Sequence, residues 1–111
     1  MKLKISEKDL QSEAIKTLKH FDNIYVIRNN NFVGKIMRPN RTSGWINNST
    51  NKGSPDLILL KNGFYIGVEF KSTDATQSKD QKKAENFIRR CGGHYFLVKT
   101  IQEFDKIIEC F

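Results

Sequence analysis

The spacing of apolar residues along the 111-residue chain predicts three helices. The first opens at Ser6 and ends near His20, with its apolar residues three and four positions apart. The second opens at Ser78 and stops at Gly92-Gly93, and the third begins at Thr100. We expect one apolar face of each helix to point inward. These faces comprise Leu10, Ala14, Ile15, Leu18 and Phe21, then Ala84, Phe87, Ile88 and Cys91, then Ile101, Phe104, Ile107 and Ile108.

Segments rich in β-branched and aromatic residues predict strands between these helices. Residues 23–28 and 32–37 form two such segments, and the three asparagines between them suggest that the strands pair as a hairpin. Residues 38–54 are mostly Asn, Ser, Thr, Gly and basic residues, which is typical of an exposed loop. A short buried strand is predicted at residues 95–98.

The centre of the chain carries the clearest hairpin pattern. Pro55 to Lys61 and Phe64 to Lys71 are separated only by Asn62-Gly63, the pair favoured in a type I′ turn because both residues tolerate positive φ. Both runs are apolar on both faces, which is typical of central strands in a covered sheet. The resulting order is α-β-β-β-β-α-β-α, a single α/β domain spanning residues 1–111.

A two-residue turn fixes which residues of this hairpin face each other. Asp56 then lies directly across from Glu69, and facing carboxylates repel unless something offsets their charge. A divalent cation with oxygen ligands would do so, since Mg²⁺ is commonly held by one or two carboxylates. Lys71 points to the same face and adds an ammonium group. This trio suits phosphodiester hydrolysis, although a three-residue loop would separate the two carboxylates, and both could be ordinary surface charges.

Composition supports a polyanionic partner. Nineteen Lys and Arg against 12 Asp and Glu give a net charge of +7, which favours nucleic acid over other partners. No stretch resembles a membrane span or a signal peptide, so we expect a cytoplasmic protein without a membrane partner. Cys91 and Cys110 stand without a Cys or His cluster, and we expect reduced thiols in or near the core.

These motifs match a known pattern. Pro55-Asp56 followed by Glu69-Phe70-Lys71 resembles the PD-(D/E)XK nuclease signature, and its surroundings resemble the VRR-NUC (virus-type replication-repair nuclease) branch of that superfamily. The likeness covers nearly the whole chain, with residues 32–52 matching least and Phe70 replacing a small β-branched residue. The further matching motifs are Glu7-x-x-Leu10-Gln11, Arg28-Asn29, Gly53-Ser54-Pro55-Asp56, and Gln81 in the helix that closes in Gly92-Gly93.

The resemblance implies a restriction-endonuclease-like fold with a mixed central sheet flanked by helices. It also implies that Mg²⁺ or Mn²⁺ is bound by Asp56, Glu69 and the backbone carbonyl of Phe70, and that Lys71 assists the attacking water.

Two further residues carry roles by the same resemblance. Glu7 would reach a second metal or its water, although an acid in a first helical turn is also favoured by the helix dipole. Gln81 would orient Lys71 or the substrate, although it also stands three residues after Ser78, as in a capping box. Glu13 is a weaker rival to Glu7, because it lies nearer the solvent side of the helix.

Basic and amide residues flanking the acid-free segment are the expected nucleic-acid contacts, and an exposed tryptophan there could stack on a base. A solvated basic surface with the tryptophan tucked under its loop is the alternative. The residues are Arg28, Asn29, Lys35, Arg38, Arg41, Trp45 and Lys52.

The resemblance therefore favours a metal-dependent, structure-selective DNA endonuclease. Because one active site cuts one strand, paired cuts require a homodimer, and stand-alone members of the family suggest a Holliday-junction resolvase. The apolar residues Ile107, Ile108 and Phe111 of the last helix could serve a dimer surface or the core. A restriction-type or nonspecific duplex endonuclease would share the same trio, and a noncatalytic DNA-binding module is the remaining alternative.

Overall fold

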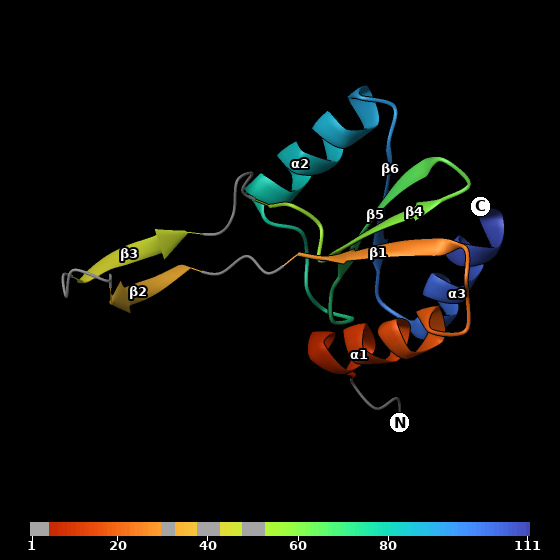
Figure 1. Cartoon of the computed structure of the whole chain (residues 1–111), viewed down its shortest axis with the longest axis horizontal. Helices are drawn as coiled ribbons and strands as arrows, with labels where there is room; N and C mark the ends of the chain where they lie inside the picture. Colours follow the sequence, from red (N-terminus) through yellow and green to blue (C-terminus); the bar gives the residue numbers. More distant parts are fainter. Residues whose placement is uncertain (1–4, 30–32, 38–42, 48–52) are drawn as a thin grey trace.

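The described residues form a four-stranded mixed sheet with three helices and a separate two-stranded ribbon (Figure 1). The computed structural model describes residues 5–29, 33–37, 43–47 and 53–111. The strand order of the main sheet is β1-β4-β5-β6, in which only β5 and β6 are parallel. The elements are α1 (Glu7–Leu18), β1 (Ile24–Arg28), β2 (Val33–Met37), β3 (Ser43–Asn47), β4 (Leu57–Lys61), β5 (Phe64–Phe70), α2 (Lys79–Arg90), β6 (His94–Val98) and α3 (Ile101–Cys110).

The central β4–β5 hairpin has the predicted turn and register. Asn62 and Gly63 both adopt positive φ, at 52° and 82°, as a type I′ turn requires. Lys61 faces Phe64 and Leu57 faces Val68. β4 and β5 are the two inner strands of the sheet, which confirms the prediction made from their continuous apolar character.

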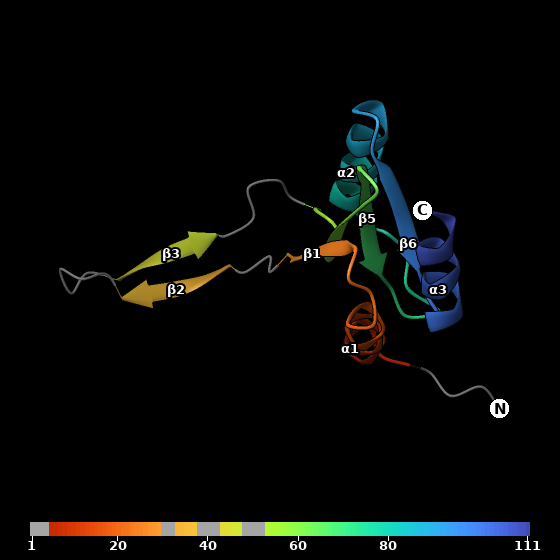
Figure 2. The same ribbon diagram turned by 45° about the vertical axis from the view of Figure 1, so that its right-hand side comes forward.

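Two predictions about the strands around this hairpin are wrong. β1 does not pair with β2; it pairs antiparallel with β4, where Val26 lies opposite Leu59. β2 pairs instead with β3, which lies within the segment predicted to be a loop. β1 pairs with β4 because one edge of this apolar strand is available to it. β3 was not predicted because its residues do not alternate between apolar and polar. The β2–β3 ribbon lies to one side of the main sheet in both views (Figures 1 and 2).

The hydrophobic core lies on the face of the sheet that packs against α1 and α3. Its fully buried members include Leu10 of α1, Phe104 of α3 and Phe70 of β5. Ile108 is buried, while Ile107 and Phe111 pack against the core from its margin. The apolar side of α3 therefore belongs to the core of the same chain, which is the second of the two roles considered for these residues.

The opposite face of the sheet is only partly covered. α2 packs mainly against β6, and none of its residues is buried. Phe87 is 64% exposed, which contradicts the predicted inward apolar face of this helix. At the far side of the same face, Tyr25 of β1 and Leu60 of β4 are also exposed.

Cys91 and Cys110 are both free and exposed, so the prediction that they lie in or near the core is wrong. Each sits at the end of a helix, where no neighbouring element covers it. Among the helices described, none is long and apolar enough to cross a bilayer.

Candidate functional site

Asp56 and Glu69 lie across from each other on the partly covered face of the sheet. Leu57 faces Val68, so the register places Asp56, just before β4, opposite Glu69 of β5. Two hydrogen bonds join the pair to the opposing backbone. The Asp56 N–H donates to Glu69 Oε2 at 3.1 Å, and the Phe70 N–H donates to Asp56 Oδ2 at 2.9 Å. The two carboxylates are therefore fixed by the hairpin itself.

Their environment disfavours negative charge. Glu69 is only 4% exposed, and burial together with the neighbouring Asp56 carboxylate raises its pKa from 4.5 to about 8. Burial also raises the pKa of Asp56, although the Phe70 N–H acts in the opposite direction. The pair is thus short of positive charge.

Lys71 supplies part of that positive charge. It follows directly after β5, and its backbone N–H donates to the carbonyl of Val98 at 3.0 Å. Its ammonium lowers the pKa of both Asp56 and Glu69, which places it within electrostatic reach of the two carboxylates. The structure therefore brings together three of the predicted residues, Asp56, Glu69 and Lys71.

Gln81 reaches the same site from the first turn of α2. Its side-chain Nε2 donates to Glu69 Oε1 at 2.6 Å, while its Oε1 accepts from the Ser78 N–H at 2.9 Å. Ser78 Oγ in turn accepts from the Gln81 N–H, which completes a capping box. The capping prediction is confirmed, and the same side chain also contacts Glu69.

Glu7 lies close to the site but is exposed at the start of α1. Its Oε1 accepts from the Ser72 N–H at 3.3 Å, which links α1 to the segment after Lys71. The Glu7 charge raises the pKa of both Asp56 and Glu69. Glu13 is exposed farther along α1.

The segment before Asp56 is held on two sides. Asn29 donates from its backbone N–H to the Asp56 carbonyl at 2.9 Å, and from Nδ2 to the Pro55 carbonyl at 3.1 Å. Gly53 has φ +78°, and a Cβ added to it would lie 2.3 Å from the carbonyl carbon of Asp80 in α2. Gly53 is needed for this close approach, whereas the sequence showed it only as part of a motif.

The structure describes only some of the residues that were predicted to contact nucleic acid. Arg28 is exposed at the end of β1, and the Asn29 amide is engaged with Pro55. Lys35 of β2 and Trp45 of β3 are paired positions in the ribbon. Arg38, Arg41 and Lys52 lie outside the described residues.

The donor atoms of this site suit a hard divalent cation. Within the described parts of the chain, no three or more His, Cys, Asp or Glu side chains gather closely enough to hold a metal. The two carboxylates of Asp56 and Glu69 remain, and Mg²⁺ characteristically binds through one or two carboxylates and keeps several waters. A cation would also relieve the mutual repulsion that raises the pKa of both groups.

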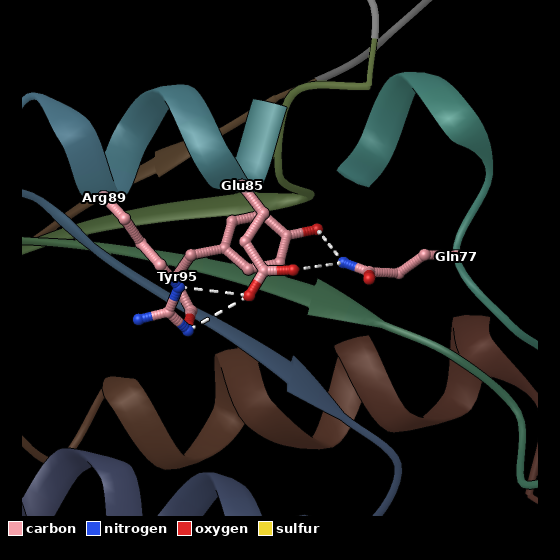
Figure 3. A network of polar contacts seen from close by, with 4 residues as sticks. All are labelled: Gln77, Glu85, Arg89 and Tyr95. Atoms are coloured by element: carbon pink, nitrogen blue, oxygen red, sulfur yellow. Dashed lines mark hydrogen bonds and ion pairs between the residues drawn. The ribbon is translucent and has the colours of Figure 1, made fainter. Parts of the chain in front are cut away.

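A polar network beside the site was not predicted. It consists of Gln77, Glu85 and Arg89 around Tyr95 of β6 (Figure 3). The four-residue spacing of Glu85 and Arg89 on one helix is a readable signal for their ion pair. Nothing local in the sequence indicates that Gln77 and Tyr95 join them.

Comparison with known proteins identifies the fold. No family model matches the sequence, and no curated protein matches it. A solved structure described as a VRR_NUC domain superposes with a TM-score of 0.63 at 19% sequence identity, covering 95% of this chain and 97% of the other. The protein therefore has the fold of a VRR_NUC domain.

Proposed function

We propose that the protein is a divalent-metal-dependent endonuclease that hydrolyses phosphodiester bonds in DNA. The observation that carries this proposal is the pair of facing carboxylates, Asp56 and Glu69, with the charge of Lys71 acting on both. The fold of a VRR_NUC domain and the net charge of +7 support the same activity and a polyanionic substrate.

Asp56, Glu69 and the backbone carbonyl of Phe70 would hold the metal, Mg²⁺ or Mn²⁺. When bound, it polarises the scissile phosphate and lowers the pKa of the attacking water. The chain's own residues perform the remaining tasks. Gln81 holds the Glu69 carboxylate in place through its amide, and Glu7, at the edge of the site, would reach a second metal or its water.

Lys71 stabilises the negative charge that develops on the phosphate oxygens and orients the attacking water. Hydrolysis joins the water oxygen to phosphorus and breaks one P–O bond to the sugar. The water loses a proton, and the leaving sugar oxygen gains one. The charge of the Lys71 ammonium acts on both carboxylates, so it also acts where this charge develops.

The substrate we propose is branched DNA, with paired cuts at a four-way junction made by a homodimer. Each chain holds one set of Asp56, Glu69 and Lys71, so symmetrical cuts in two strands require two chains. The exposed Arg28, the Asn29 that braces the Asp56 segment, and the ribbon residues Lys35 and Trp45 contact the nucleic acid. Arg38, Arg41 and Lys52 belong to the same proposal.

The test is cleavage of end-labelled four-way junction, flap and linear duplex DNA in Mg²⁺, in Mn²⁺ and in EDTA. Glu69→Ala removes a proposed ligand, and Glu109→Ala is the matched control, because Glu109 is an exposed acid of α3. Symmetrical nicks in the junction, lost in EDTA and in Glu69→Ala alone, support a junction resolvase. Equal cleavage of linear duplex would contradict the junction preference, and binding without cleavage in either metal would contradict the nuclease.

A further inference from the structure

The helix that delivers Gln81 to Glu69 is weakly anchored by apolar contacts. None of the α2 residues is buried, and the helix packs mainly against β6 rather than across the sheet. Hydrophobic burial normally fixes the position of a helix on a sheet, at about 1.5–3 kcal/mol for each fully buried large side chain. α2 has only part of that restraint, because its apolar residues Ala84 and Ile88 are only partly covered, yet Gln81 makes a 2.6 Å contact that depends on where α2 lies.

A set of polar contacts supplies the missing restraint. We call Gln77, Glu85, Arg89 and Tyr95 the α2 network (Figure 3). Gln77 Nε2 donates to Glu85 Oε1 at 3.1 Å and to the Tyr95 hydroxyl at 3.3 Å. Arg89 donates from Nε to Glu85 Oε2 at 3.1 Å, and from an Nη atom to the Tyr95 carbonyl at 2.7 Å.

These contacts restrain both ends of the helix. Gln77 immediately precedes the N-cap Ser78, while Arg89 lies in the last turn, and both contact the same residue of β6. The anchor itself is rigid, because Tyr95 is fully buried. Its hydroxyl stays protonated, since burial raises its pKa to about 12.

The anchor lies on the face of the sheet that carries the site. Tyr95 pairs with Gly67 in β5, two residues before Glu69, so both side chains stand on the same face. A shift of α2 relative to Tyr95 therefore changes the separation between Gln81 and Glu69 directly.

We propose that the α2 network is a positioning device for Gln81, and that Gln77 is the residue that joins Glu85 of α2 to the hydroxyl of Tyr95. The proposal rests on the proposed nuclease function where turnover is measured, although the Gln81–Glu69 contact can be followed without it. Gln77 contacts Glu85 and Tyr95 but neither Asp56 nor Glu69, so it is a positioning residue and acts through Gln81.

The experiment compares Gln77→Leu, Gln81→Ala and the double variant in DNA cleavage, with Gln102→Leu as the matched control on the exposed side of α3. We expect Gln77→Leu to lower kcat about tenfold to a hundredfold with little change in KM, since small misplacements near a reacting centre cost that much. The double variant should be no slower than Gln81→Ala, because both changes remove one effect. Losses that multiply would overturn the proposal.

A second readout is independent of catalysis. In the metal-free protein, the side-chain amide signal of Gln81 is assigned in an amide NMR spectrum by its absence in Gln81→Ala. We expect this signal to move toward the position of solvent-exposed glutamine amides in Gln77→Leu and to stay in place in Gln102→Leu. An unmoved signal would overturn the proposal, even if the wild-type protein cleaved no DNA and the nuclease function itself had failed.

Two further variants separate positioning from general loss of folding. Tyr95→Phe keeps the buried ring and removes only the hydroxyl that accepts from Gln77. We expect it to shift the Gln81 signal in the same direction as Gln77→Leu. Gln77→Lys retains a donor toward Glu85 and should restore both the signal and kcat. If Tyr95→Phe leaves the signal and kcat unchanged, or Gln77→Lys behaves like Gln77→Leu, the α2 network does not position Gln81.

Discussion

Replacing Glu69 by Gln should change how the stability of the metal-free protein depends on pH. In the folded protein, the Glu69 pKa is raised from 4.5 to about 8 by burial and by the Asp56 carboxylate. Between these two values the folded state binds a proton that the unfolded chain has released. The contribution of Glu69 to the free energy of unfolding is therefore fully present below pH 4.5. It falls as the pH rises from 4.5 and is lost above about 8.

The magnitude follows from the same two values. The interval from 4.5 to about 8 spans roughly 3.5 pH units, and each unit corresponds to about 1.4 kcal/mol, so the upper limit is about 5 kcal/mol. This is a large share of the roughly 5–15 kcal/mol that stabilises a typical domain. Glu69→Gln removes the titrating group while it keeps the size of the side chain, and Gln also leaves an acceptor for the Asp56 N–H.

Urea unfolding followed by circular dichroism, in EDTA from pH 5 to pH 9, measures the effect. We expect the difference in unfolding free energy between Glu69→Gln and wild type to grow by about 2–4 kcal/mol over this range, in favour of the variant. Glu109→Gln, an exposed change on α3, should follow the wild type. A difference that stays constant with pH would refute the reasoning, because Glu69 would then titrate alike in the folded and unfolded states.

Three other changes test separate parts of the site. Mg²⁺ should raise the melting temperature of wild type more at pH 8 than at pH 5, because it competes with the proton on Glu69. Asp56→Asn should abolish most of this rise, and an equal rise in the variant would show that Asp56 is not a ligand. Lys71→Met should lower kcat by about 100-fold in single-turnover cleavage, while an unchanged rate would exclude its proposed role. Gly53→Ala should lower the free energy of unfolding, measured in urea, by about 1–3 kcal/mol more than Gly63→Ala does. Both glycines have positive φ, but only a Cβ at Gly53 would clash with α2, so equal losses would contradict that packing.

The β4–β5 hairpin could be predicted because its turn and register depend on residues close together in the sequence. Asn62-Gly63 dictates the turn, the turn dictates the register, and the register alone places Asp56 opposite Glu69. The cap at Ser78 is equally local, since Ser78 and Gln81 satisfy each other within one turn of α2. These features required no knowledge of distant parts of the chain.

Features that depend on long-range packing were not predictable in the same way. β1 could pair with either β2 or β4, and nothing in its residues decides between the two partners. The apolar spacing in α2 indicates an inward face, yet α2 packs mainly against β6 and Phe87 is left exposed. The hydrogen bond of Gln77 with Tyr95 joins residues 18 positions apart, and no local sequence pattern at either residue predicts it.

The most direct test of the central claim is cleavage of labelled four-way junction DNA by purified, folded protein in Mg²⁺ or Mn²⁺. Wild type and Glu69→Gln should be compared at equal concentration, because the variant retains the shape of the site and loses only the carboxylate. The account predicts metal-dependent strand cleavage by wild type and none by Glu69→Gln. Cleavage at the same rate by both proteins would contradict the assignment of the site, and cleavage by neither in either metal would contradict the nuclease itself.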